Sequence, residues 1–284
     1  MKTLIFSDVH LKVTQEDKEE HREFISFLRG IDPAEFDRII ILGDLFDFWF
    51  EYKHVVFSGY FNVLRAFAEL RDQGIDLHLV CGNHDFWAGR FLRDELGMQI
   101  HRIDYRCTFG DRRVLLIHGD GMNPKDVSYR IYKSFARSRL VIWLFSLLHP
   151  DWAMWIAEAA SNASRVRYER RHAKWGEEPR SLHDFAKEVL AMGGVDVLLC
   201  GHTHEPVKET LPTPQGPGLY INTGDWLNRR SYVVWDGERF ALKVYGEARV
   251  ASSTSSAAEQ RTEEVHVSEY IADDQRRQGD QQPE

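Results

Sequence analysis

Cysteine is scarce in this 284-residue sequence, which contains only Cys81, Cys107 and Cys200. An odd number without framework spacing argues against a disulfide scaffold, so we expect reduced, buried thiols. Long hydrophobic runs are also missing, since the apolar stretch from Leu140 to Leu148 is about half the ~20 residues of a membrane-spanning helix. The beginning, "MKTLIFSDVH", becomes polar too early for a signal peptide. We therefore expect a cytoplasmic protein.

Basic charge is not in excess either, because the formal net charge at pH 7 is −8. Residues 251–284 hold eight acidic residues and three arginines, with few apolar residues and no periodicity, and are predicted to form a disordered acidic tail. The tail's −5 leaves −3 for residues 1–250, which we interpret as one globular domain. This nearly balanced charge gives no reason to expect a nucleic-acid partner. No internal repeat or other sequence pattern defines an oligomeric state.

Short apolar runs alternate with helical periodicity along this domain. Strands are predicted at 3–7, 38–43, 76–82, 113–119 and 195–201. Strands that alternate with helices indicate an α/β protein whose ligands bind beyond the strand ends. After Leu219 the pattern becomes more antiparallel, with a hairpin signal at Asp236-Gly237, and a second sheet is expected there.

Residues of about 122–193 form an insertion of different character, helical by composition. Its first part carries a stripe of apolar residues at helical spacing, namely Leu140, Trp143, Leu144, Leu147 and Leu148. Basic residues flank this stripe in the sequence on both sides: Arg130, Lys133, Arg137 and Arg139 before it, and Arg165, Arg167, Arg170, Arg171 and Lys174 after it. The stripe could pack against the domain. It could equally belong to a lid that contacts acyl chains or an anionic membrane surface, or whose arginines clamp a diphosphate.

Each of five predicted strands ends in residues that can bind metal ions. The side chains that follow these strands are Asp8, His10, Asp44, Asn83, His118, His202 and His204. They divide into two sets that share the Asp44 carboxylate: Asp8, His10, Asp44 and His204, and Asp44, Asn83, His118 and His202. Imidazole, carboxylate and amide ligands without thiolate suit two divalent ions, Mn²⁺ first, with Fe or Zn as alternatives. The alternative is a set of polar strand ends.

The ordered motifs D-x-H, G-D-x-x-D, G-N-H-D, H-G-D and G-H-T-H resemble the calcineurin-like metallophosphoesterase family from Met1 to about Tyr245. The resemblance implies a four-layer sandwich, two β-sheets flanked by helices, with the insertion as a helical lid. It implies a metal-dependent phosphoesterase in which His84 assists at the phosphoryl group and Asp85 orients the His84 ring. Asp47, Asp85 and Asp120 are turn residues or carboxylates that orient ligands, the latter favoured for Asp85 and Asp120, while Asp225 fits either role.

Within the family, "GDLFDFWFEYKHVV", "HGDGMNPKDVSY" and "YINTGDWL" are similar to the UDP-2,3-diacylglucosamine pyrophosphatases of lipid A synthesis. The similarity implies that the pyrophosphate bond of a glycolipid nucleotide is cleaved to UMP and 2,3-diacylglucosamine 1-phosphate. It implies substrate contacts from Asn83, His84, Asp126, Tyr129, Ser164 and Arg171. His84 departs from the enterobacterial form, which has arginine there and not the histidine of the wider family.

Three hypotheses follow. In the first, the enzyme cleaves the glycolipid nucleotide and associates peripherally with the cytoplasmic face of the inner membrane. In the second, the same chemistry acts on a soluble nucleotide or a phosphoprotein, but such a substrate would not need an apolar insertion. In the third, the fold is a scaffold without turnover, although a scaffold has no use for a complete ligand set.

Overall fold

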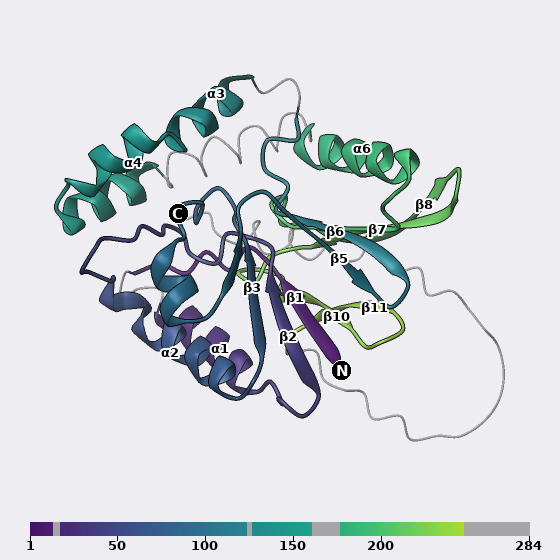
Figure 1. Cartoon of the computed structure of the whole chain (residues 1–284), viewed down its shortest axis with the longest axis horizontal. Helices are drawn as coiled ribbons and strands as arrows, with labels where there is room; N and C mark the ends of the chain where they lie inside the picture. Colours follow the sequence, from purple (N-terminus) through teal and green to yellow (C-terminus); the bar gives the residue numbers. More distant parts are fainter. Residues whose placement is uncertain (14–17, 124–126, 161–176, 247–284) are drawn as a thin grey trace, which may run out of the picture. The chain divides into compact units, whose positions relative to one another are not determined.

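Two β-sheets packed face to face form the centre of the fold (Figure 1). The computed structural model describes residues 1–13, 18–123, 127–160 and 177–246. Residues Met1–Gly246 belong to one compact unit. The predicted acidic tail lies outside the described residues, so its disorder stays a prediction.

The first sheet has six strands and the second has five. Their orders are β11(Phe240–Val244)-β10(Ser231–Trp235)-β1(Lys2–Phe6)-β2(Phe36–Ile41)-β3(Asp76–Val80)-β4(Gln99–His101) and β5(Asp104–Phe109)-β6(Arg112–Ile117)-β7(Val197–Cys200)-β9(Gly216–Thr223)-β8(Pro206–Thr213). Strands β1 to β4 are parallel, as are β6, β7 and β9, and the remaining strands are antiparallel. The carboxyl ends of the parallel strands therefore provide the loops that can build a site.

Alternation along the strands divides the core into layers. In β1, Leu4 and Phe6 pack toward helices α1(Lys18–Arg29) and α2(Phe61–Asp72), whereas Ile5 packs between the sheets. The outer face of the second sheet is covered by α6(Glu177–Met192), through Leu182, Ala186 and Leu190. The expected four-layer α/β sandwich is confirmed. Two single turns complete the core, η1(Ser58–Tyr60) and η2(Phe91–Glu95).

The lid is shorter than the predicted insertion. Its described helices are α3(Val127–Ala136), α4(Arg139–Ser146) and a helical segment over 150–160. They stand together at the upper left of Figure 1, apart from α6. The interpretation of 177–192 as part of the lid was wrong, because the apolar spacing of α6 buries one face against the second sheet.

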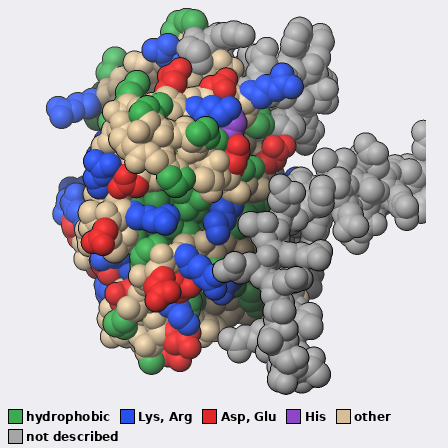
Figure 2. Space-filling view, turned by 90° about the vertical axis from the view of Figure 1, so that its right-hand side faces the viewer, with side chains coloured by type: hydrophobic (Ala, Val, Ile, Leu, Met, Phe, Trp, Pro, Cys, Tyr) green, Lys and Arg blue, Asp and Glu red, His purple; other side chains and the backbone are tan. Residues whose placement is uncertain are grey.

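The C-terminal strands also join a different sheet from the one expected. The hairpin at Asp236-Gly237 is confirmed, but β10 pairs with β1 and so extends the first sheet. None of the helices among the described residues combines the length and the apolar composition needed to cross a bilayer. Figure 2 shows a face on which acidic and basic side chains are interspersed, without a field of one sign on its described part.

Two histidines close one edge of the layer between the sheets. Nε2 of His78 donates to Asp76 Oδ2 at 2.9 Å, so Nδ1 of His78 accepts from Nε2 of His101 at 3.1 Å. The Tyr105 ring stacks on both imidazoles, with centroids 4.8 and 4.1 Å away. Burial lowers the pKa of both histidines, although the Asp76 carboxylate acts in the opposite direction. The arrangement therefore requires the His78 ring to be neutral, because its Nδ1 must accept from His101.

We predict that this pair makes stability fall in mild acid. The folded-state pKa values lie below the ordinary 6.5 of the unfolded chain, so as pH falls through about 6.5 the unfolded state binds more protons and gains population. Urea unfolding at about pH 7.5 and about pH 5.5, with saturating Mn²⁺, should show a smaller pH-dependent loss for His101→Gln than for the parent. An unchanged loss in the variant would contradict the role of the pair.

Candidate metal centre

The loops after the parallel strands contain residues with positive φ, a backbone conformation that residues other than glycine rarely adopt. Six non-glycine residues in the described chain have positive φ, and five of them are predicted ligands. Their φ values are 53° for Asp8, 48° for His10, 53° for Asp44, 71° for His202 and 60° for His204. Such residues cost about 1–3 kcal/mol each and occur mainly at functional sites. Here the turns direct the side chains toward one region.

Two glycines allow the loops to approach each other. A Cβ on Gly82 would lie 2.7 Å from the Asp44 backbone nitrogen and would overlap the Asp44 carboxylate. A Cβ on Gly201 would overlap Ser7 and Asp8 in the same way. Only glycine therefore fits between these loops and the carboxylates beside them.

Asp8, His10 and His204 form the first ligand group. Nε2 of His204 lies 3.3 Å from Asp8 Oδ1 and 3.2 Å from Nε2 of His10. The other oxygen of Asp8 accepts from the backbone amide of His202 at 2.8 Å. Asp8 Oδ1 is buried and accepts no hydrogen bond. A buried carboxylate oxygen that accepts no hydrogen bond and lies among imidazole nitrogens is suited to bind a cation.

Asp44, His118 and His202 form the second group, with Asn83 beside them. Nδ1 of His118 donates to the Leu42 carbonyl at 2.7 Å, which leaves Nε2 to face Asp44 Oδ2 at 3.3 Å and Asn83 Oδ1 at 3.1 Å. Asp44 Oδ2 also lies 3.8 Å from Nε2 of His10, so this carboxylate borders both groups. Asp44 therefore lies close to the members of both predicted sets, and His10, Asp44 and His84 form a further cluster; which of these residues bind metal stays a prediction.

The electrostatics of the two groups fit divalent cations. Burial by itself would lower the pKa of His10 and of His118. Nearby carboxylates have a larger, opposite effect and raise both pKa values to about 10. These carboxylates are Asp47 and Asp8 for His10, and Asp44 for His118. Burial, followed by the charge of His118, lowers the pKa of His202 to about 4. Without cations, protons must balance the buried carboxylates. Divalent ions would replace these protons, since metal-bound imidazole is neutral.

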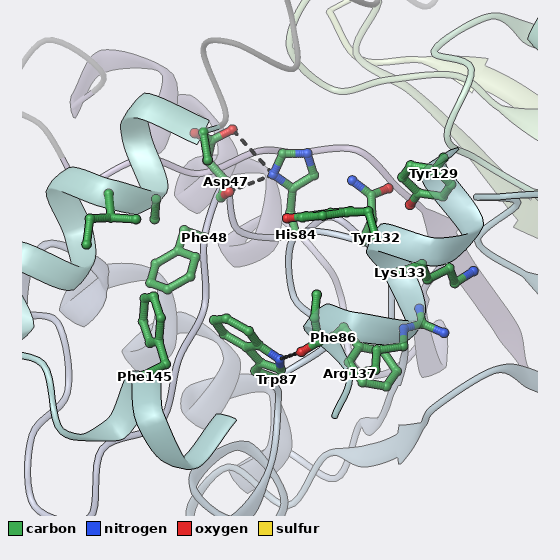
Figure 3. Close-up of a pocket in the computed structure, with 15 residues that line it drawn as sticks. Asp47, Phe48, His84, Phe86, Trp87, Tyr129, Tyr132, Lys133, Arg137 and Phe145 are labelled. Carbon is green, nitrogen blue, oxygen red and sulfur yellow. Dashed lines mark hydrogen bonds and ion pairs between the residues drawn. The ribbon is translucent and has the colours of Figure 1, made fainter. Parts of the chain in front are cut away.

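His84 lies beside His10 and Asp44 and also lines a cavity, where Figure 3 shows its ring next to Asp47. Its Nδ1 donates to the backbone carbonyl of Asp47 at 2.7 Å, and its ring meets that of His10 edge to face. This bond fixes the tautomer and leaves Nε2, 3.9 Å from Asp44 Oδ2, facing the site. With a second proton on Nε2, the ring is placed to donate a proton or a hydrogen bond to a phosphoryl oxygen.

Asp85 does not orient His84, and that prediction was wrong in its contacts. Its two oxygens accept from the backbone amides of Gly82 at 2.7 Å and Leu45 at 2.9 Å. Burial, followed by the charge of Asp44, raises the pKa of Asp85 to about 7. Asp85 therefore ties the loops after β2 and β3 together, and Asp47 holds the imidazole.

Asp120 anchors the lid, and its expected role in orienting a metal ligand stays a prediction. Its carboxylate accepts from Lys133 at 2.6 Å and from the Tyr129 hydroxyl at 3.0 Å, and Arg137 lies 3.7 Å away. Asp225 accepts from Asn228 and from the Arg229 amide, both at 2.9 Å. Its Oδ2 is 3.8 Å from Nδ1 of His204, so it borders a ligand as well as closing a turn.

The cavity beside His84 encloses about 210 Å³ between the core and the lid. Asn83 and His84 line it near the metal groups, and Lys133 and Arg137 line one side, where the Arg137 guanidinium lies 3.7 Å from the centre of the Phe86 ring (Figure 3). Its other end is apolar, and there Phe145 of α4 sits within 6 Å, centroid to centroid, of three rings of the core: Phe48, Phe50 and Trp87. The cavity therefore suits an amphiphile with an anionic end at the metals.

Three of the predicted substrate contacts line this cavity, namely Asn83, His84 and Tyr129. Asp126, Ser164 and Arg171 lie outside the described residues. Sequence reasoning missed its aromatic wall, Phe48, Phe86, Trp87 and Phe145, and the inward cations Lys133 and Arg137. The runs "FDFWF" and "NHDFW" directly after two ligand loops were the signal for part of that wall.

Comparison with known proteins gives one family. The model of calcineurin-like phosphoesterases matches residues 1–206. A UDP-2,3-diacylglucosamine hydrolase of Porphyromonas gingivalis is 33% identical over 222 residues, 72% of this chain and 82% of that protein. One from Azotobacter vinelandii is 28% identical over 250 residues, 86% and 99% of the two chains. Vacuolar Protein Sorting 29 from Cryptosporidium parvum aligns at a TM-score of 0.40 and 13% identity over 85% and 96% of the chains, too remote to carry an argument.

Replacing the shared carboxylate should remove both metals. We predict that Asp44→Ala lowers bound divalent metal from about two ions per chain to near zero, because each group loses a buried anion. Elemental analysis after dialysis against Mn²⁺ measures this, with exposed Asp111→Ala as the control. Parental metal content in Asp44→Ala would show that the carboxylate is not shared.

Truncating His84 should affect rate and spare the metals. We expect His84→Ala to lower the maximal rate about 10²–10⁴-fold, the range for a positioned acid–base group, with metal content near the parental value. The exposed His54→Ala serves as the control. Loss of metal from His84→Ala would instead make His84 a ligand with its neighbours His10 and Asp44.

Proposed function

Because the chain belongs to the calcineurin-like phosphoesterase family, we propose that it hydrolyses the pyrophosphate bond of UDP-2,3-diacylglucosamine. Water adds across the P–O–P bond, so that UMP and 2,3-diacylglucosamine 1-phosphate leave as the two phosphates. The observation that carries this choice is the cavity under the lid, which is lined by Asn83 and His84 beside the metal groups, by Lys133 and Arg137 along one side and by aromatic rings at its far end. A soluble nucleotide or phosphoprotein would leave that end empty.

The residues of the site divide the chemistry among them. Two divalent ions, Mn²⁺ in our proposal, supply Lewis-acid stabilisation of the phosphoryl oxygens and lower the pKa of water when they are bound. Asp44 holds the two groups at a common carboxylate. His84 is oriented by the Asp47 carbonyl, and its Nε2 donates to a phosphoryl or leaving oxygen when both ring nitrogens carry protons.

The lid helix α3 has its polar face inside and its apolar face outside. Tyr129, Lys133 and Arg137 recur every four residues and contact Asp120 of the core. Ile131 and Phe135, both 65% exposed, lie on the outer side. Ordinary surface helices show the reverse pattern, so the exposed face is suited to an apolar partner.

Helix α4 continues this exposed surface. The stripe that could have packed against the domain is exposed at Leu140, Trp143, Leu144 and Leu147, and Trp152 and Trp155 follow on the next segment. The packing interpretation was therefore wrong for these four stripe residues, whereas Leu148 is half-buried and Phe145 contacts the core. Arg130 and Arg139 are exposed beside it, while Lys133 and Arg137 turn inward. These features support peripheral attachment to an anionic lipid surface.

Replacing exposed leucines of the lid separates a lipid substrate from a soluble one. We expect Leu144→Asn with Leu147→Asn to impair hydrolysis of UDP-2,3-diacylglucosamine at least about tenfold and to spare a small chromogenic phosphodiester. Each methylene transferred from water is worth about 0.8 kcal/mol, and only the lipid has methylenes to transfer. UMP release and chromophore release are measured with the same preparations.

The matched control is Met192→Asn, an exposed apolar residue at the end of α6. Sedimentation with vesicles that contain anionic lipid should also decrease in the double variant and not in the control. Equal losses on both substrates would contradict the lipid assignment. Failure of the parent protein to release UMP from the lipid would contradict the proposed function.

A further inference from the structure

A second cavity borders the metal centre at the end away from the lid. Its lining residues come from the loops after β1 and β9 and from α1: Val9, His10, Leu11, His21, Glu23, Trp226, Leu227 and Arg230. The cavity under the lid borders the loops after β2 and β3 instead. Since the order in the first sheet is β10-β1-β2-β3, the two cavities flank the metal groups from opposite sides, with His10 between them.

Arg230 is the cation of this second cavity. It donates to Glu23 Oε2 at 2.5 Å, and both side chains remain about two-fifths exposed. In the described chain, Arg230 is the single non-glycine residue with positive φ, 50°, that is not a predicted metal ligand. The Tyr245 amide donates to its carbonyl at 2.9 Å and holds this conformation. The strained turn places a guanidinium at the mouth of a cavity that opens on His10.

A diphosphate ester has two halves. When its diphosphate lies at the metal centre, the two halves must extend from that centre in different directions. The cavity under the lid matches the acyl half. The second cavity, about 80 Å³, has room for several waters and hence for a phosphate or a ribose, because one water needs about 10–15 Å³ on this measure. A third cavity, beside His202, holds only about 10 Å³ and has no room for a sugar.

We propose that the second cavity binds the nucleoside monophosphate half of the substrate, with Arg230 as its anion-binding residue. The proposal rests on the proposed function and assigns a specificity-determining residue to it. Arg230 binds a phosphate or ribose oxygen with its planar guanidinium, and Glu23 holds that group in place until the nucleotide arrives. The apolar side chains of Leu11 and Leu227 bound the same space.

The experiment titrates UMP into the full-length protein with saturating Mn²⁺ and follows binding by calorimetry. Arg230→Gln should weaken UMP binding about tenfold to a hundredfold, the loss of a charge-assisted hydrogen bond. Glu23→Gln should bind UMP as tightly as the parent or more tightly, because the guanidinium loses its competitor. The neighbouring Arg229→Gln, exposed and outside the cavity lining, should bind as the parent does.

Equal weakening by Arg230→Gln and Glu23→Gln would overturn the proposal, because it would show that the ion pair only supports the fold. Unchanged UMP binding in Arg230→Gln would overturn it as well. Titration with glucosamine 1-phosphate should give the same affinity for Arg230→Gln and parent. A loss as large as that for UMP would place Arg230 among general phosphate contacts and reject the nucleotide assignment.

Binding of UMP is measured without turnover, so it is independent of the lipid assay. If the parent hydrolyses UDP-2,3-diacylglucosamine and Arg230→Gln binds UMP normally, only the second cavity is misassigned. If the parent does not hydrolyse the lipid, the proposed function fails, and an Arg230-dependent affinity for UMP would still assign the cavity to a nucleotide.

Discussion

The structure depends on strand-end loops that turn through positive φ while two sheets hold them in place. Asp8, after a strand of the first sheet, accepts from the His202 amide of the second, and His118 of the second sheet donates to Leu42 of the first. The same bonds that close the sandwich therefore orient its ligands. Each strained turn costs about 1–3 kcal/mol, an expense that only a large buried core can offset. This explains why a site of a few side chains needs two complete sheets.

The strands, and the clustering of the candidate ligands, could be predicted from the sequence because both follow from local pattern. An apolar run ending in a carboxylate or imidazole specifies a strand and a ligand at its end, and five such ends converge at one edge of a parallel arrangement. The partner of His84 could not be predicted in this way. Its acceptor is the backbone carbonyl of Asp47, and every residue carries such a carbonyl. The adjacent Asp85 looked suitable but satisfies two loop amides.

The lid shows a second limit of sequence patterns. Periodicity identifies an apolar face on a helix but does not say whether that face meets the protein or the outside. In α6 the apolar face meets the second sheet, and in α3 it points away from the core. The difference lies in Asp120, whose carboxylate collects Tyr129, Lys133 and Arg137 from the opposite face of α3. The contact between Asp120 and α3 depends on how close the two lie in the folded chain, and the spacing of residues in the sequence does not reveal that distance.

The lid helix α3 turns its polar face toward the core, and this orientation keeps the cavity beside His84 from being filled by apolar side chains. An apolar face turned inward would bury itself against Phe48 and Trp87, stabilise that contact by about 25 cal/mol per Å² and fill the cavity beside His84. A polar anchor attaches the helix by a few directional bonds and leaves the space open, while Phe145, Ala136 and Arg137 of the lid contact the aromatic wall. The apolar surface that remains outside then needs its own partner, and a lipid layer would cover it while supplying acyl chains to the open cavity. One constraint, an empty apolar cavity next to buried charges, thus links the anchor, the exposed stripe and the proposed substrate.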